Sequence, residues 1–161
     1  MKKIIVFLVV ILFIISCSKK EFNAEPSNTN ISQIDSFLQK ISNSAKYIVV
    51  PLKDFDKTNS SNKVVIALRH DMDHDLRACL KMAYLEHKYH IRATFYVLHT
   101  ASYYGITELN YFNRNDDVVN KLKNIQNKLG HEVGLHNDLV TLQVVYNLEP
   151  IDFLKTELSF R

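Results

Sequence analysis

The stretch VVIALRHDMDHD, residues 64–75, decides the fold that the rest of the chain has to complete. Its first part, residues 64–68, is an unbroken apolar run, which is typical of a parallel strand buried on both faces. Arginine, histidine and aspartate follow that run directly. In open α/β sheets and in β/α barrels, the reactive groups lie just past the carboxyl ends of the strands. The stretch therefore predicts a buried strand with a functional site at its end.

Downstream of this strand, helix-like and strand-like patterns alternate. We expect a helix over about residues 75–89, with Asp75 as its N-cap and an inner face made of Leu76, Cys79, Leu80, Ala83 and Tyr84. A strand at 93–98, a helix at about 116–129 and a strand at 132–135 are expected next, with Gly130 as the C-cap of that helix. This alternation predicts a parallel sheet with right-handed crossovers, which gathers the strand ends at one edge.

Upstream of the strand, apolar residues at helical spacing predict an amphipathic helix over residues 32–42. A short extended piece at 47–52 and a polar loop at 57–63 lead from that helix into the buried strand. Residues 150–160 predict one more helix near the other end of the chain.

The first sixteen residues have the pattern of an export signal and are expected to lie outside the fold. Lys2 and Lys3 supply a basic start, and residues 4–15 are an apolar run of 12 residues, shorter than the roughly 20 that a spanning helix needs. The run ends in Ile14-Ile15-Ser16-Cys17, which resembles the lipobox of bacterial lipoproteins, where cleavage precedes a cysteine that receives lipid. An ordinary secretory signal with an incidental cysteine is the alternative.

The lipobox resemblance implies a protein anchored to a membrane of the bacterial cell envelope through lipidated Cys17. Ser18 is not the aspartate that retains some lipoproteins at the inner membrane, so an outer-membrane or surface location is open. Residues 17–30, which are rich in polar side chains, predict an unstructured tether. The folded domain is expected over residues 31–161.

Charge and cysteine content exclude two classes of protein. Removal of residues 1–16 takes away two lysines, so the formal charge falls from +3 to +1, which leaves no electrostatic case for binding nucleic acid. With Cys17 lipidated, Cys79 is the one cysteine left and no internal disulfide can form. Its spacing on the predicted helix favours a small buried side chain over a nucleophile.

The polar residues after the buried strand have the composition of a metal-dependent hydrolytic site. Arg69, Asp71 and Asp73 alternate along the chain and so share one side of an extended strand. Of the two aspartates, one can bind a metal ion and stay ionised while the other accepts a proton, and His136 joins them from the end of a neighbouring strand. These groups are suited to a divalent ion, zinc above all. The alternative is that an aspartate only caps the next helix and that the nearby histidines are exposed loop residues.

Three segments together carry a family resemblance: ALRHDMDHD, IRATFYVLH and LGHEVGLHND. They resemble the first three strands of the polysaccharide deacetylase superfamily, the NodB-homology domain. The resemblance implies the N-terminal part of a deformed (β/α) barrel, incomplete at its C-terminus, that removes N- or O-acetyl groups from a polysaccharide. It assigns the role of general base to Asp71 and the role of metal ligands to Asp73 and His136.

Two departures from the family pattern bear on activity. The second histidine of the family's metal motif would fall at Val140, which cannot ligate, so Asp138 is the candidate replacement and His74 a weaker one. The alternative for Asp138 is a cap on the next helix. The family's later motifs, including a distal histidine that acts as general acid, are not in this sequence, so we expect a truncated domain in which catalysis is reduced or absent.

The sequence therefore favours a metal-dependent polysaccharide deacetylase-like lipoprotein, with a non-catalytic envelope lipoprotein or carbohydrate-binding remnant as the alternative. Another metal hydrolase, such as a phosphoesterase, is a third possibility. Tyr103 and Tyr104 are more typical of packing than of stacking on a sugar, and His99 is more typical of a structural histidine than of a ligand. No residue is assigned to substrate binding, and no oligomeric state is predicted.

Overall fold

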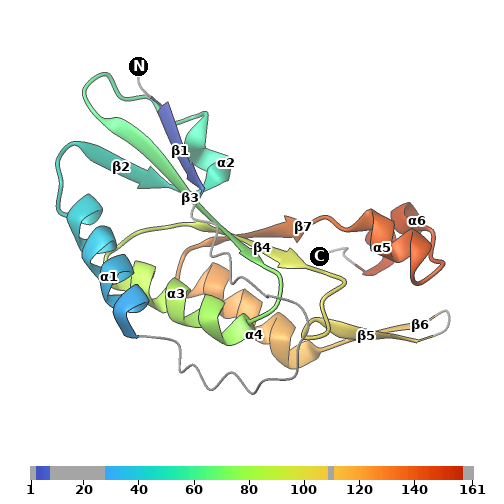
Figure 1. Cartoon of the computed structure of the whole chain (residues 1–161). Helices are drawn as coiled ribbons and strands as arrows, with labels where there is room; N and C mark the ends of the chain where they lie inside the picture. Colours follow the sequence, from blue (N-terminus) through green and yellow to red (C-terminus); the bar gives the residue numbers. More distant parts are fainter. Residues whose placement is uncertain (1–2, 8–27, 109–110, 158–161) are drawn as a thin grey trace, which may run out of the picture.

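The structure is a computed structural model, and it describes residues 3–7, 28–108 and 111–157. These residues form an α/β fold built on a five-stranded sheet in which the pairings are all parallel (Figure 1). The strands are β1 (Lys3–Phe7), β2 (Tyr47–Val50), β3 (Val64–Met72), β4 (Thr94–Leu98) and β7 (Glu132–His136). The sheet order is β1-β3-β4-β7, and β2 also pairs with β3. The predicted α/β class and parallel sheet are confirmed.

The predicted helices that have a capping residue begin and end close to their predicted positions. They are α1 (Asn28–Ser42), α2 (Leu52–Phe55), α3 (Leu76–Lys88), α4 (Asp116–Asn127), α5 (Leu139–Val144) and α6 (Pro150–Glu157). The predicted N-cap of α3 is confirmed, because Asp75 Oδ1 accepts hydrogen bonds from the backbone N–H groups of Arg77 and Ala78 at 2.8 and 3.2 Å. Asn115 caps α4 in the same way.

The two faces of the sheet are covered differently. Helices α1, α3 and α4 lie along one face (Figure 1), and their apolar side chains form the main core with residues of β3 and β4, among them Ile66, Leu68, Phe95 and Val97. On the opposite face, Phe55 of α2 packs on Val65 and Ala67 in a second, smaller core. Because side chains alternate along a strand, the residues of β3 that follow Ala67 on this second face are Arg69 and Asp71.

Several elements differ from the sequence-based expectation. The segment between β4 and α4 contains an antiparallel hairpin, β5 (Gly105–Glu108) and β6 (Tyr111–Arg114), where a loop was expected. Strand β3 extends to Met72, four residues past the apolar run, because β4 pairs with residues 69–72. Helix α1 begins at Asn28, inside the predicted tether, and α5 was not predicted.

Two further differences concern individual side chains and the predicted export signal. Tyr84 is 59% exposed and does not belong to the inner face of α3, whereas Glu86 is fully buried there. Residues Lys3–Phe7 form strand β1 and pair in parallel with β3, although the sequence predicts an export signal at this place. Cys17, the predicted lipidation site, and most of the predicted tether lie outside the described residues. Within the described ranges, no helix combines the length and the apolar character that crossing a membrane requires.

Candidate functional site

The second face of the sheet carries three aligned rows of residues, most of them polar, and we call it the polar face. It is defined by Arg69 and Asp71 of β3, Thr94, Tyr96 and Leu98 of β4, and Glu132, Gly134 and His136 of β7. The parallel register places Asp71, Tyr96 and Gly134 opposite one another in the middle row. Leu98 and His136 form the last row, nearest the carboxyl ends of the strands.

At the start of the strands, the polar face is closed by α2. The Thr94 hydroxyl accepts a hydrogen bond from the backbone N–H of Leu52 at 2.8 Å and donates one to Glu132 Oε2 at 2.6 Å. The same carboxylate oxygen accepts from the backbone N–H of Lys53 at 3.0 Å. These polar groups are satisfied within the protein. A functional site on this face therefore belongs at the opposite end, where the strands finish.

Asp73 and His136 meet at that end of the polar face. The Nδ1 atom of His136 lies 2.8 Å from Oδ1 of Asp73, although the two residues are 63 positions apart in the sequence. Their side chains are 31% and 42% exposed, so both can be reached by water and ions. The sequence expected His136 on a neighbouring strand, but β4 lies between β3 and β7, and Asp73 reaches His136 from just beyond the end of β3.

Two donors of this kind fit part of a zinc site. Zinc takes imidazole nitrogen and carboxylate oxygen at about 2.0–2.2 Å, which places two donors of a tetrahedral ion roughly 3.4 Å apart. The observed separation of His136 Nδ1 and Asp73 Oδ1, 2.8 Å, is shorter than this, so the two side chains would have to move apart to hold the ion. Among the described residues, no group of three or more His, Cys, Asp and Glu side chains is gathered closely enough to hold a metal ion.

Asp138, the predicted third ligand, is engaged elsewhere. Its Oδ2 accepts a hydrogen bond from the Thr100 hydroxyl at 2.6 Å, and its Oδ1 accepts from the backbone N–H of Thr141 at 3.3 Å, as the N-cap of α5. The hydrogen bond from Thr100 is the main reason that the pKa of Asp138 lies below its ordinary value, so the carboxylate stays ionised. This arrangement corresponds to the capping role that the sequence left open. His74, the weaker candidate, is an exposed residue between β3 and α3.

Asp71, the predicted base, is held by an arginine on its own strand. Arg69 Nε donates to Asp71 Oδ1 at 2.7 Å and Arg69 Nη2 donates to Oδ2 at 3.1 Å, which makes a bidentate pair. The hydrogen bond from Arg69 to Asp71 is also the largest reason that the pKa of Arg69 is raised. A carboxylate has about four lone-pair positions, so two remain on Asp71 to accept a proton. Strand alternation predicts that Arg69 lies on the same side as Asp71, but the sequence assigns Arg69 no function.

Other residues that the sequence singled out have structural roles. Tyr103 donates its hydroxyl to the backbone carbonyl of Met72, and burial raises its pKa, so it packs the end of β3. Tyr104 and His99 are each 1% exposed, and His99 Nδ1 lies 3.2 Å from the His136 carbonyl oxygen. Burial raises the pKa of the Cys79 thiol to about 12, which keeps it protonated and agrees with a non-nucleophilic residue.

The helix-covered face contains a buried polar cluster that the sequence did not predict. His70 Nε2 lies 2.7 Å from Glu86 Oε1, and these side chains are 5% and 0% exposed. His131 Nδ1 lies 3.9 Å from the other carboxyl oxygen of Glu86. The helical position of Glu86, three residues after Ala83 on the inner face of α3, is the signal that identifies it in retrospect.

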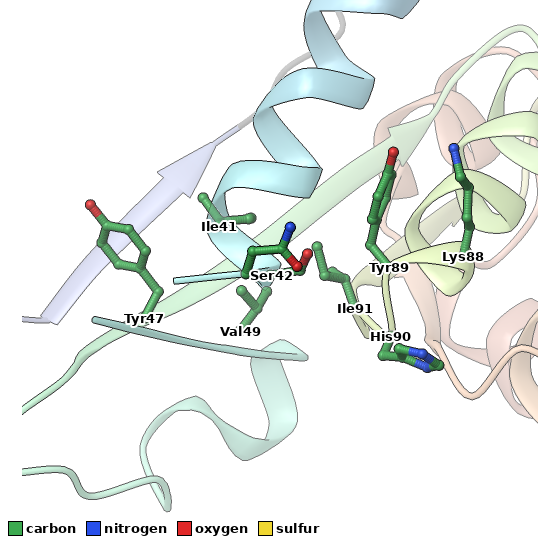
Figure 2. Close-up of a pocket in the computed structure, with 9 residues that line it drawn as sticks. Ile41, Ser42, Tyr47, Val49, Lys88, Tyr89, His90 and Ile91 are labelled. Carbon is green, nitrogen blue, oxygen red and sulfur yellow. The ribbon is translucent and has the colours of Figure 1, made fainter. Parts of the chain in front are cut away.

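A separate hollow of about 340 Å³ opens at the other end of the sheet (Figure 2). It lies between the last turn of α1, strand β2 and the end of α3. Figure 2 shows Tyr47 and Tyr89 on opposite sides of Ile41, Ser42 and Val49. This hollow lies near the amino ends of β2 and β4, whereas Asp73 and His136 are at the carboxyl ends, so it is not part of the candidate metal site.

Comparisons of the chain with models of protein families, with curated proteins and with solved structures gave no match.

Proposed function

We propose that this chain is a metal-dependent deacetylase-like hydrolase that acts on N- or O-acetyl groups of a cell-envelope or extracellular polysaccharide. The observation that carries the proposal is the 2.8 Å approach of His136 to Asp73 at the carboxyl ends of parallel strands. Asp71 lies on the same face of the sheet, two residues before Asp73 in the chain. We further propose that the sheet is part of a deformed (β/α) barrel and that Cys17 anchors the protein to a membrane of the cell envelope.

In this proposal, Asp73 and His136 hold a divalent ion, zinc for preference, because carboxylate and imidazole are ligands that zinc accepts. Such an ion supplies Lewis acidity and lowers the pKa of water toward about 7 when that water binds zinc. Asp71 accepts the proton that the attacking water loses. Asp138 completes the ligand set if its carboxylate gives up its hydrogen bonds with the Thr100 hydroxyl and the backbone N–H of Thr141 and binds the ion instead.

A second candidate function is supported by the same contacts. Both oxygens of Asp71 are engaged by Arg69, and both oxygens of Asp138 are engaged by Thr100 and Thr141. A polar face in which these carboxylates stay engaged suits a non-catalytic carbohydrate-binding lipoprotein. In such a protein the Asp73–His136 pair is a hydrogen bond at the end of the sheet and holds no metal.

Metal binding separates the two candidates. We expect the purified protein to bind about one equivalent of zinc, measured by calorimetric titration and by metal analysis after dialysis. Asp73→Ala or His136→Ala should abolish the binding, since each removes one of the two ligands that the fold brings together. Asp116→Ala and His87→Ala are the matched controls, because they remove an exposed carboxylate and an exposed imidazole elsewhere on the molecule.

Acetate release then tests the reaction. The wild-type protein with zinc should release acetate from N-acetylated chitooligosaccharides, and Asp71→Asn should reduce the rate by at least about a hundredfold while zinc still binds, because a general base contributes 10²–10⁴-fold. Equal and negligible zinc content in the wild type and both ligand variants contradicts the metal site. Negligible zinc content favours the binding protein, whereas zinc binding without acetate release contradicts the proposed hydrolase activity.

A further inference from the structure

The ring of Tyr96 occupies the centre of the polar face because the residue beside it on β7 has no side chain. Tyr96 pairs with Gly134 in the β4–β7 register. A Cβ atom added to Gly134 would lie 2.8 Å from Cε1 and 3.0 Å from Cδ1 of Tyr96, closer than real Cβ atoms approach ring carbons. The tyrosine ring therefore lies directly on the backbone of Gly134, and any larger residue at 134 must displace it.

On its other side, the ring of Tyr96 supports Arg69. The guanidinium carbon of Arg69 is 4.5 Å from the centroid of the Tyr96 ring, within the range of a cation–π contact. The same guanidinium group makes the bidentate pair with Asp71 at 2.7 and 3.1 Å. Arg69 is thus fixed from two directions, by an aromatic face and by a carboxylate. A lysine cannot reproduce both contacts, because its ammonium group lacks the planar fork.

This stack fixes the plane of the Asp71 carboxylate. A carboxylate on an exposed strand otherwise rotates about its terminal torsion, which is broad and poorly defined. Two parallel hydrogen bonds from a planar donor allow one orientation only. A proton acceptor needs a fixed orientation, because reaction rates fall steeply when a catalytic group is displaced by about 1 Å.

We propose that Arg69 is a positioning residue for Asp71 and that Tyr96, lying on Gly134, holds Arg69 in place. This inference rests on the proposed function for the role of Asp71, but the stack itself is a property of the fold that can be measured without activity.

The first experiment measures the stack directly by NMR on the purified protein. The Nε–H proton of Arg69 should exchange slowly with water, because it is hydrogen-bonded, and should be shifted upfield by the Tyr96 ring. Tyr96→Leu removes the ring, so the upfield shift should disappear and exchange should accelerate about tenfold or more. Tyr96→Phe keeps the ring and should preserve both signals. An unchanged Arg69 signal in Tyr96→Leu overturns the proposed support.

The second experiment measures acetate release from N-acetylated chitooligosaccharides with zinc present. Arg69→Gln should lower kcat about tenfold or more while leaving KM and zinc binding unchanged, and Arg69→Lys should restore little of the loss. Tyr96→Leu should lower kcat in the same direction, and Tyr96→Phe, which keeps the ring, should lower it less. Arg92→Gln is the matched control, because Arg92 also pairs with an aspartate, Asp54 at 3.0 Å, but at the start of the strands, where α2 closes the polar face. Unaltered kcat in Arg69→Gln contradicts the positioning role.

The two experiments keep the inference separate from the proposed function. If the wild-type protein releases no acetate but shows the protected, upfield-shifted Arg69 signal, the proposed hydrolase function is overturned and the contact between Arg69 and the Tyr96 ring is supported. If the wild-type protein releases acetate, but Tyr96→Leu and Tyr96→Phe do not differ in either measurement, the proposed hydrolase is retained and the positioning role of the stack is overturned.

Discussion

Each of the two faces of the sheet carries a close imidazole–carboxyl pair, and the comparison between these pairs separates structure from function. On the helix-covered face, His70 and Glu86 lie 2.7 Å apart with side chains 5% and 0% exposed. On the polar face, His136 and Asp73 lie 2.8 Å apart with side chains 31% and 42% exposed. The contact distances are nearly equal. What differs is whether water and ions can compete for the two groups.

Burial decides what each pair can do. A buried carboxyl group that loses its partner has no water to replace it, so removal of one partner is strongly destabilising. An exposed pair gains little from its mutual contact, because water solvates both groups almost as well. The Asp73–His136 pair can therefore exchange its internal hydrogen bond for hydrogen bonds to water at small cost in stability. The His70–Glu86 pair cannot do so without opening the core.

The buried side also contains a histidine whose protonation state is fixed by its neighbours. The backbone N–H of Ala93 donates to His131 Nδ1 at 3.1 Å, so this nitrogen carries no proton. His131 Nε2 lies 2.9 Å from the carbonyl oxygen of Ala83 and must donate to it. His131 is thus neutral, in agreement with a pKa that burial lowers below its ordinary value.

The largest expected effect comes from removing the buried carboxyl group. Glu86→Ala should lower the free energy of unfolding by roughly 3–5 kcal/mol, because it leaves His70 without its partner and opens a cavity. Asp73→Ala should change it by less than about 1 kcal/mol. Urea denaturation of both variants measures the difference. Equal losses of stability in the two variants would contradict the view that burial makes the His70–Glu86 pair more important for stability than the Asp73–His136 pair.

A smaller effect is expected from filling the space beneath Tyr96. Gly134→Ala should lower the free energy of unfolding by about 1–3 kcal/mol, because its Cβ must displace the tyrosine ring. The double variant Gly134→Ala/Tyr96→Leu should recover part of that loss, since leucine is smaller and can move aside. A double variant whose loss equals the sum of the two single losses would contradict direct contact between these residues.

The smallest expected effect is a pH dependence that belongs to the buried face. Burial lowers the pKa of His131 in the folded state below the ordinary value of 6.5, so the unfolded chain binds the proton more readily. The contribution of neutral His131 to the free energy of unfolding is therefore complete above about pH 6.5. It is lost as the pH falls through the lowered pKa of the folded state. Urea denaturation of the wild type between about pH 7.5 and 5 should show a free energy of unfolding that declines gradually as the pH falls.

The variant His131→Gln is the control for this prediction, because glutamine does not titrate. Its free energy of unfolding should depend less steeply on pH over the same range, whatever its absolute stability. Identical slopes in the wild type and in His131→Gln would assign the pH dependence to other groups.

The sequence alone determined the order of elements, because that order depends on local pattern. The apolar run before Arg69 and the helical spacing after Asp75 are properties of neighbouring residues, and they predicted β3, the cap of α3 and the parallel sheet. Alternation along an extended strand also placed Arg69 and Asp71 on one side. The hairpin β5–β6 and helix α5 were missed because their short segments carry too little periodicity.

Only the tertiary structure decided which partners these residues meet. The contact of Asp73 with His136 spans 63 positions, that of Asp138 with Thr100 spans 38, and Gly134 lies beneath a tyrosine 38 positions away. No local pattern encodes such distances, because they depend on the sheet order and on the register of strands that are not adjacent in the sequence. Burial follows from the same packing, and it separates Glu86, enclosed beneath α3, from Asp73, which remains open to water.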